Sequence, residues 1–265
     1  WWSHLLLNIK MMPSLNMCGF LYTGADLCGF GADTTEDLAL RWMQFGVFTP
    51  LMRNHAALGT REQELYQFSN REACGKMVKI RYSLLPYLYS EYMKAALRDE
   101  MMFRPLAFDY PDDPYADQIE DQLMVGDSIM IAPVHEQNAT GRYVYLPEDM
   151  MLVSMRSPED YSVQVVEKGH HYVPVAIDEL IFFILKNHVI PVAKSAKSVE
   201  EMDFEHLSLL GYVTDKAVYE LYDDDGNNKD YENPEHYEKI TVSGKGTIRQ
   251  SGKMKKAFEK FDGIR

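Results

Sequence analysis

The stretch FLYTGADLCGFGADTTEDLALRWMQFGVFTPLMRNHAALGTREQELYQF, residues 20–68, alternates apolar segments with a helical pattern. One apolar segment covers residues 18–23, and a second covers residues 47–52. Between them, two threonines followed by two acidic residues, at positions 34–37, are typical of a helix start. This order of strand, helix and strand predicts βα units and a parallel sheet.

The segments on either side extend the pattern. Residues 2–12 predict a helix that Pro13 closes. Residues 72–99 predict a long helix, with apolar side chains at helical spacing. We therefore expect the first hundred residues to form an α/β structure.

After residue 99 the pattern changes to short strands separated by Pro, Gly, Asp and Asn, which is typical of an antiparallel sandwich. A polar segment at residues 194–201 precedes a last group of strands, and the tail from Lys253 onward predicts a helix or a frayed end. The expected strands cover residues 101–109, 128–134, 142–146, 151–155, 161–166, 172–177, 180–185, 207–213, 217–222, 239–243 and 247–250.

The composition is that of a globular chain of 265 residues, of which 46% are hydrophobic and 25% are charged. A formal net charge of −13 argues against nucleic acid or an anionic membrane surface as a partner. Three cysteines, Cys18, Cys28 and Cys74, offer neither a disulfide framework nor zinc-ligand spacing, so we expect no metal and a reducing, cytoplasmic location. No apolar run is long enough to span a membrane.

The first residues, WWSHLLL at positions 1–7, lack an initiator Met and a signal-like segment. They enter directly into an amphipathic helical pattern. We therefore expect the chain to be a piece of a longer polypeptide, with a processed start as the alternative.

Four side chains near the ends of the two N-terminal strands are candidates for ligand binding. Asp26 follows the first apolar segment in a glycine-rich turn, and Arg53 and His55 follow the second. In parallel βα arrays, functional side chains lie at the carboxyl ends of the strands. Such a carboxylate, guanidinium and imidazole suit a polyhydroxylated ligand, and Phe30 suits the face of a sugar. The alternatives are a helix cap for Asp26, a structural ion pair for Arg53, a buried histidine for His55 and a core position for Phe30.

Three motifs of this stretch carry a resemblance: YTGAD-x-CGF at 22–30, RWMQ-x-G-x-F-x-P at 41–50 and MRNH…GTREQE at 52–64. Their order and spacing resemble family 31 of the glycoside hydrolases, the α-glucosidase family. The similarity continues through RYSLLPYLYSEY at 81–92 and DQLMVGDSIMIAPV at 121–134. The resemblance implies retaining hydrolysis of terminal α-linked glucose at the C-terminal face of a (β/α)8 barrel.

The resemblance also implies a division of the chain. Residues 1–105 correspond to the C-terminal βα units of the barrel. Residues 106–198 correspond to a proximal β-sandwich, and residues 199–265 to a short distal β segment.

The family's pattern implies a role for each candidate residue. Asp26 matches a pocket carboxylate near the −1 sugar, Phe30 an aromatic lining the same pocket, His55 a histidine bonding a sugar hydroxyl, and Arg53 a supporting arginine. Retaining hydrolysis needs two carboxyl groups about 5–5.5 Å apart. The family's nucleophile and acid/base aspartates belong to motifs upstream of the position of Trp1. We therefore expect no catalytic residue in this chain and no activity from it alone.

The implied partners are an α-glucoside oligosaccharide and the upstream half of the same enzyme, and a homo-oligomer is left open. No cofactor is expected, because chemistry carried by two carboxylates needs none. Two alternatives remain: a non-catalytic carbohydrate-binding or structural fragment, and an α-xylosidase of the same family.

Overall fold

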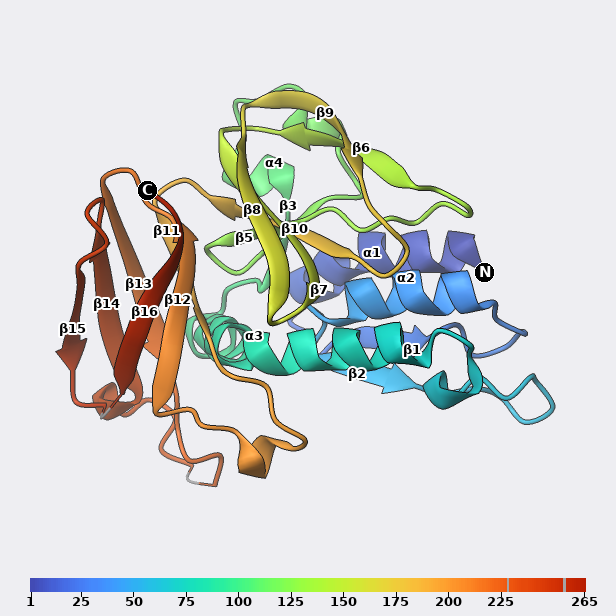
Figure 1. Ribbon diagram of the computed structural model, residues 1–265, viewed down its shortest axis with the longest axis horizontal. Helices are drawn as coiled ribbons and strands as arrows, with labels where there is room; N and C mark the ends of the chain where they lie inside the picture. The colour runs from blue at the N-terminus through green and yellow to red at the C-terminus, as the bar shows by residue number, and fades with distance from the viewer. Residues whose placement is uncertain (228, 255) are drawn as a thin grey trace.

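The computed structural model describes residues 1–227, 229–254 and 256–265. Helices and a pair of parallel strands form the N-terminal third, and mostly antiparallel sheets form the rest (Figure 1). This confirms the expected α/β part followed by a β-rich part. The N-terminal elements are α1 (Trp2–Met17), β1 (Gly24–Leu27), α2 (Glu36–Gly46), β2 (Leu51–Asn54), η1 (Leu65–Gln67) and α3 (Arg71–Arg98).

Strands β1 and β2 pair in parallel, and both begin later than the apolar segments predict. Gly24 explains the position of β1, because a Cβ at this residue would lie 2.2 Å from the carbonyl oxygen of Leu51. Only glycine permits so close an approach of the two backbones. Asp26 and Arg53 consequently lie within the strands rather than after them, and His55 directly follows β2.

Helix α1 runs through Pro13 to Met17, so the prediction that Pro13 closes this helix is wrong. Tertiary contacts hold the last turn in place. Asn16 is buried, its Oδ1 accepts a hydrogen bond of 2.9 Å from the backbone N–H of Phe103, and its Nδ2 donates to the carbonyl oxygen of Phe20. These contacts offset the backbone hydrogen bond that a proline inside a helix removes.

A six-stranded antiparallel sheet, in the order β3-β4-β5-β10-β7-β8, forms the centre of the sandwich. One of its faces packs toward the helices, and the other packs toward the two-stranded sheet of β6 and β9. The segment 101–109, expected as one strand, divides into a strand and a short helix. The elements are β3 (Phe103–Pro105), α4 (Leu106–Asp109), η2 (Ala116–Gln118), β4 (Leu123–Val125), β5 (Ile129–Ile131), β6 (Gly141–Leu146), β7 (Met150–Ser157), β8 (Asp160–Val166), β9 (Gly169–Pro174) and β10 (Leu180–Leu185).

Two three-stranded sheets form the C-terminal part, β11-β12-β16 and β13-β14-β15. They lie beside the C-terminal half of α3 (Figure 1), which contacts β11 and β13. Their elements are β11 (His188–Val192), η3 (Val199–Glu201), β12 (His206–Tyr212), β13 (Lys216–Tyr222), η4 (Pro234–His236), β14 (Tyr237–Ser243), β15 (Ile248–Gly252) and β16 (Ala257–Ile264).

The tail forms strand β16, so the prediction of a helix or frayed end is wrong. Phe258, Phe261 and Ile264 recur every third residue, a spacing typical of a helix. The register with β12 shifts between Leu207 and Leu209, whose partners are Phe258 and Phe261. This bulge gives β16 one extra residue and brings both phenylalanines against the core.

Arg41 connects helix α2 to the sandwich. Although it is charged, its exposed fraction is only 2%. Its guanidinium donates to the carbonyl oxygens of Ala139, Val175 and Ala176 at 3.1, 2.9 and 2.9 Å, and to Gln44 Oε1 at 3.0 Å. Burial lowers the pKa of Arg41 to about 10, so the side chain stays protonated at neutral pH. Four acceptors thus hold one buried cation between the two parts of the molecule.

Candidate functional site

Asp26 and Arg53 face each other across the two parallel strands. They are direct partners in the β1–β2 register. Arg53 Nε donates to Asp26 Oδ1 at 2.7 Å, and Arg53 Nη2 lies 2.5 Å from the same oxygen. The side chain of Asp26 is 17% exposed and that of Arg53 is 56% exposed. Because both contacts fall on Oδ1, Arg53 leaves the second carboxylate oxygen of Asp26 unengaged.

Phe30 and His55 form the second half of the site. Their ring centroids lie 5.3 Å apart, with the ring planes inclined at 35°. Both side chains are exposed. The alternatives of a core phenylalanine and a buried histidine are therefore wrong. The ion pair of Arg53 with Asp26 does exist, as that alternative expects.

A tight turn places Phe30 beside the second strand. The backbone N–H of Gly29 donates to the carbonyl oxygen of Asp26 at 3.1 Å, with Cys28 at φ 74° and Gly29 at φ 84°. The left-handed conformation of Cys28 is unusual for a residue with a side chain. The chain then reaches the loop after β2, where the N–H of Ala57 donates to the carbonyl oxygen of Phe30 at 2.8 Å.

Asn54 and Cys28 also belong to this region, and the sequence did not single them out for a role there. Asn54 Nδ2 donates to Cys28 Sγ at 3.3 Å. Burial, together with the nearby thiol of Cys74, raises the pKa of Cys28 to about 12, against a smaller opposing effect of Asn54. The thiol is therefore protonated at neutral pH and is not a nucleophile. Side chains alternate between the two faces of a strand, so the sequence could have placed Asn54 on the face of β2 opposite Arg53. This alternation was the one signal in the sequence that pointed to a contact of Asn54 behind the site.

Two titratable clusters lie away from the site. In the sandwich, Asp121 accepts from His135 at 2.9 Å and pairs with Arg142 at 3.0 Å. On α3, Glu91 pairs with Lys94 at 2.7 Å and accepts a hydrogen bond of 2.7 Å from Tyr219. Within the part of the chain that the structure describes, no group of three or more His, Cys, Asp or Glu side chains is arranged to hold a metal ion.

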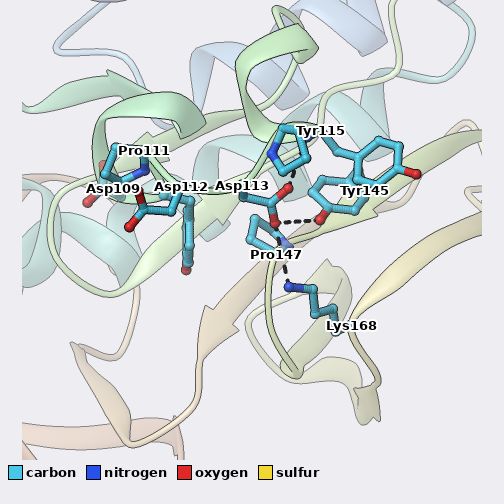
Figure 2. A pocket seen from close by; sticks show the side chains of 10 residues that line it. Asp109, Pro111, Asp112, Asp113, Tyr115, Tyr145, Pro147 and Lys168 are labelled. Atoms are coloured by element: carbon cyan, nitrogen blue, oxygen red, sulfur yellow. Dashed lines mark hydrogen bonds and ion pairs between the residues drawn. The ribbon is translucent and has the colours of Figure 1, made fainter.

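A separate cleft of about 490 Å³ lies beside α4, whereas β1 and β2 lie at the opposite side of the molecule (Figure 1). Figure 2 shows Asp113 at its centre, where Tyr145 donates to the carboxylate at 2.5 Å and Lys168 lies 3.6 Å away. The Tyr145 hydrogen bond lowers the pKa of Asp113. These polar groups bind one another, so the centre of the cleft links the loop after α4 to strand β6 and to the turn between β8 and β9.

Two family models match the chain between residues 1 and 190. Residues 1–91 match the family model described as the glycosyl hydrolases family 31 TIM-barrel domain. Residues 99–190 match the model of the glycosyl hydrolase family 31 C-terminal domain. The chain belongs to glycoside hydrolase family 31.

Its family 31 relatives include α-glucosidases from bacteria and mammals. The chain is 34% identical to alpha-glucosidase 2 of Bacillus thermoamyloliquefaciens, with 87% of the chain and 29% of the relative covered. It is 33% identical to the lysosomal alpha-glucosidase of Bos taurus, with 86% and 26% covered. The chain thus spans less than a third of the length of these relatives.

Solved family 31 structures share the fold. The dextranase FjDex31A of Flavobacterium johnsoniae, complexed with glucose, superimposes with a TM-score of 0.80 at 25% identity over 94% of this chain and 32% of that one. The α-xylosidase Xac1773 of Xanthomonas citri gives a TM-score of 0.69 at 26% identity over 87% of this chain and 25% of that one. Among the described residues of the present chain, no helix is long and apolar enough to cross a membrane.

Proposed function

We propose that this chain forms the sugar-binding side of the active-site pocket in a retaining α-glucosidase that removes terminal, non-reducing α-linked glucose from oligosaccharides. Two contacts carry the proposal: the cross-strand ion pair of Asp26 and Arg53, and the exposed ring pair of Phe30 and His55. All four side chains lie at or just after the carboxyl ends of two parallel strands. This is the end at which active sites form in barrels of this kind.

Each residue has a chemical role in the proposal. The free oxygen of the Asp26 carboxylate accepts from a hydroxyl group of the sugar at −1, and the Arg53 guanidinium holds that carboxylate in position. His55 hydrogen-bonds a second hydroxyl group. Phe30 packs against the C–H face of the pyranose, which is apolar enough to favour an aromatic ring.

The catalytic carboxylates are proposed to lie outside this chain. Retaining hydrolysis requires a nucleophile and an acid/base about 5–5.5 Å apart. Asp26 is engaged by Arg53 and is a single carboxylate, so it does not fill both roles. We propose that segments upstream of Trp1 supply the pair, that the upstream half of the barrel is the chain's partner, and that the chain alone is inactive.

The division of the chain follows the same proposal. Residues 1–105 contribute the last βα units of the barrel, residues 106–198 the proximal sandwich and residues 199–265 the distal β segment. The contacts of Arg41 support this part of the proposal, because Arg41 binds sandwich carbonyl groups from the helix that connects β1 to β2. A cytoplasmic location is proposed from the free cysteines, although three relatives are named as lysosomal enzymes.

An α-xylosidase is the second candidate, favoured by the structural similarity to Xac1773. The two sugars differ by a hydroxymethyl group at C5, so a pocket specific for xylose excludes the larger glucose. A non-catalytic carbohydrate-binding fragment is the other alternative. In that case, sugar binding would depend on the β-domains and not on His55.

The experiment is hydrolysis of p-nitrophenyl α-glucoside and p-nitrophenyl α-xyloside by the enzyme that contains this chain, with its His55→Ala variant alongside. We expect glucoside hydrolysis that His55→Ala lowers strongly. Faster hydrolysis of the xyloside would favour the α-xylosidase. Binding of a glucose-like inhibitor that His55→Ala leaves unchanged would contradict the proposed pocket.

A further inference from the structure

The side chain of Gln63 is buried between the loops that follow β1 and β2, with an exposed fraction of 2%. Its Nε2 donates to the carbonyl oxygen of Gly29 at 3.1 Å and to that of His55 at 3.2 Å. The carbonyl oxygen of Leu27 lies 3.5 Å from the same nitrogen. One side-chain amide therefore joins the backbones of two loops that are more than twenty residues apart in sequence.

These three carbonyl groups belong to the backbone that carries the proposed pocket residues. Leu27 comes one residue after Asp26, and Gly29 comes one residue before Phe30. The remaining carbonyl group is that of His55 itself. The amide of Gln63 thus sits behind the pocket and contacts the backbone of both its halves. A side chain in this place determines how far apart the two loops lie.

The orientation of the amide follows from its surroundings. A nitrogen facing three carbonyl oxygens donates to them, whereas an amide turned by 180° would place its oxygen against the same oxygens. In the adopted orientation, Gln63 Oε1 is buried without a hydrogen-bond partner among the described residues. A buried acceptor without a partner costs free energy. The amide keeps this orientation because its two donors bind the loops.

The backbone of Gln63 is held as well. Asn54 Nδ2 donates to the carbonyl oxygen of Gln63 at 3.1 Å while it also contacts Cys28 Sγ. The same side chain therefore links the last residue of β2 to the turn after β1 and to the segment that carries Gln63. The loops are fixed to each other before any ligand enters, which reduces the ordering cost of binding.

We propose that Gln63 is a positioning residue that sets the separation of Phe30 and His55 and thereby the affinity of the pocket for a glucosyl unit. Gln63 does not itself touch the sugar in this proposal. The inference rests on the proposed function for its kinetic consequence, but its structural part, the control of His55 by Gln63, is independent of that function. A displacement of about 1 Å in a positioned group is enough to lower activity by orders of magnitude.

The first test uses the complete enzyme with Gln63→Met, which keeps the length of the side chain and removes both donors. We expect KM for p-nitrophenyl α-glucoside to rise about tenfold and kcat/KM to fall at least as much. Gln122→Met is the matched control: Gln122 is 1% exposed and its Nε2 donates to the carbonyl oxygen of Tyr145 at 2.7 Å, in the sandwich. It removes an equally buried amide, whose Oε1 also accepts from the N–H of Tyr145 at 2.8 Å, so we expect at least as large a loss of thermal stability with KM unchanged.

The second test observes His55 directly, by NMR of protein labelled with ¹³C at the histidine rings and assigned with His55→Gln. Gln63→Met should move the His55 signal, whereas Gln122→Met should not. If Gln63→Met fails to fold, Gln63→Leu repeats both tests, because it also removes both donors and buries no charge.

The outcomes separate the two proposals. An unmoved His55 signal, or a moved signal with KM unchanged, would overturn the role of Gln63. If the parent enzyme hydrolyses no α-glucoside, the proposed function fails, and the His55 signal still decides whether Gln63 positions that residue.

Discussion

Arg53 and Asp26 occupy directly opposed positions in the parallel register of β1 and β2, and Arg53 Nε donates to Asp26 Oδ1 at 2.7 Å. The contact is therefore set by strand pairing rather than by the conformation of a loop. A shift of the register by one residue would place the two side chains on opposite faces of the sheet. Gly24, which allows the close approach to Leu51, fixes that register at the start of β1.

The first prediction concerns the charge of Asp26. Asp26→Asn keeps the shape of the side chain but removes the charged acceptor and the counter-charge of Arg53. Since hydrogen bonds to charged groups contribute about 1.5–3 kcal/mol, kcat/KM for p-nitrophenyl α-glucoside should fall roughly 10- to 100-fold in the complete enzyme. Thermal stability should change little, because an exposed ion pair contributes about 0–1 kcal/mol.

Asp112→Asn is the control for this prediction. Asp112 is an exposed aspartate in the cleft beside α4 and is remote from the proposed pocket. It should leave kcat/KM unchanged. An Asp26→Asn enzyme with the kinetics of the parent would show that this carboxylate does not bind substrate.

The second prediction concerns the buried cation of α2. Arg41→Met removes the donor to the carbonyl groups of Ala139 and Val175, whereas the carbonyl group of Ala176 keeps its hydrogen bond from the N–H of Glu179 at 3.1 Å. The free energy of unfolding should decrease by about 3 kcal/mol, since each buried acceptor left unsatisfied costs roughly 1–3 kcal/mol and part of this is recovered by relaxation. Urea unfolding measures the change. Arg156→Met removes an arginine whose side chain is 44% exposed and should cost less than about 0.5 kcal/mol.

The third prediction concerns Asp121 and acid stability. Burial alone would raise the pKa of Asp121, but the hydrogen bond from His135 and the charge of Arg142 outweigh burial and lower it to about 2. A carboxyl group with a lowered pKa in the folded state stabilises the protein above its unfolded pKa of about 3.9 and loses that contribution as the pH falls toward 2. The contribution amounts to about 2 kcal/mol.

Asp121→Asn tests this linkage. The difference in unfolding free energy between parent and variant should be constant at pH 5–7 and should shrink between pH 4 and pH 2. Urea titrations at each pH measure it. If the difference in unfolding free energy stays the same from pH 6 to pH 3, the pKa of Asp121 is the same in the folded and unfolded states, and the prediction is wrong.

The fourth prediction concerns the chain without its proposed upstream half. Among the described residues, β1 and β2 pair only with each other, and the nearby side chains of Trp1, Phe20 and Tyr22 are 64–67% exposed. Open strand edges beside exposed apolar groups favour association. The purified chain should therefore self-associate, and co-expression with the upstream half of the barrel should yield a one-to-one complex with a higher Tm. Size-exclusion chromatography of a lone chain that remains monomeric and melts cooperatively would contradict this.

The elements that can be predicted from the sequence are those in which local signals and tertiary packing agree. Helix α2 begins at Glu36, as the two threonines and the acidic first turn predict. Strand β1 was placed too early, because Phe20 and Tyr22 make the preceding segment apolar although both side chains are exposed. A run of apolar residues does not reveal whether another part of the protein covers their side chains. The family could be identified from its motifs because they involve many residues in a fixed order. The secondary-structure predictions depended only on the spacing of apolar residues.

The supporting residues of the site could not be found in this way. Gln63 lies in a loop rich in charged residues, and nothing in its neighbours indicates that it is buried. Its contacts depend on the turn at Cys28 and on the loop after β2, which come together only in the folded chain. Strand β16 is a similar case, because its bulge converts the expected two-residue alternation into a spacing of three.

The pairing of β16 with β12 has a consequence for biosynthesis. Strand β12 ends at Tyr212 and β16 begins at Ala257, and three strands of another sheet lie between them in the sequence. During translation, β12 stays unpaired on one edge until β13, β14, β15 and then β16 have left the ribosome. The elements that pack against one another in the helical part and the sandwich have all been synthesised before that. A ribosome-bound nascent chain that ends before Ala257 would therefore present an unpaired edge of β12, on the side where β16 otherwise contacts β8. This edge is where we expect chaperones to engage the growing polypeptide.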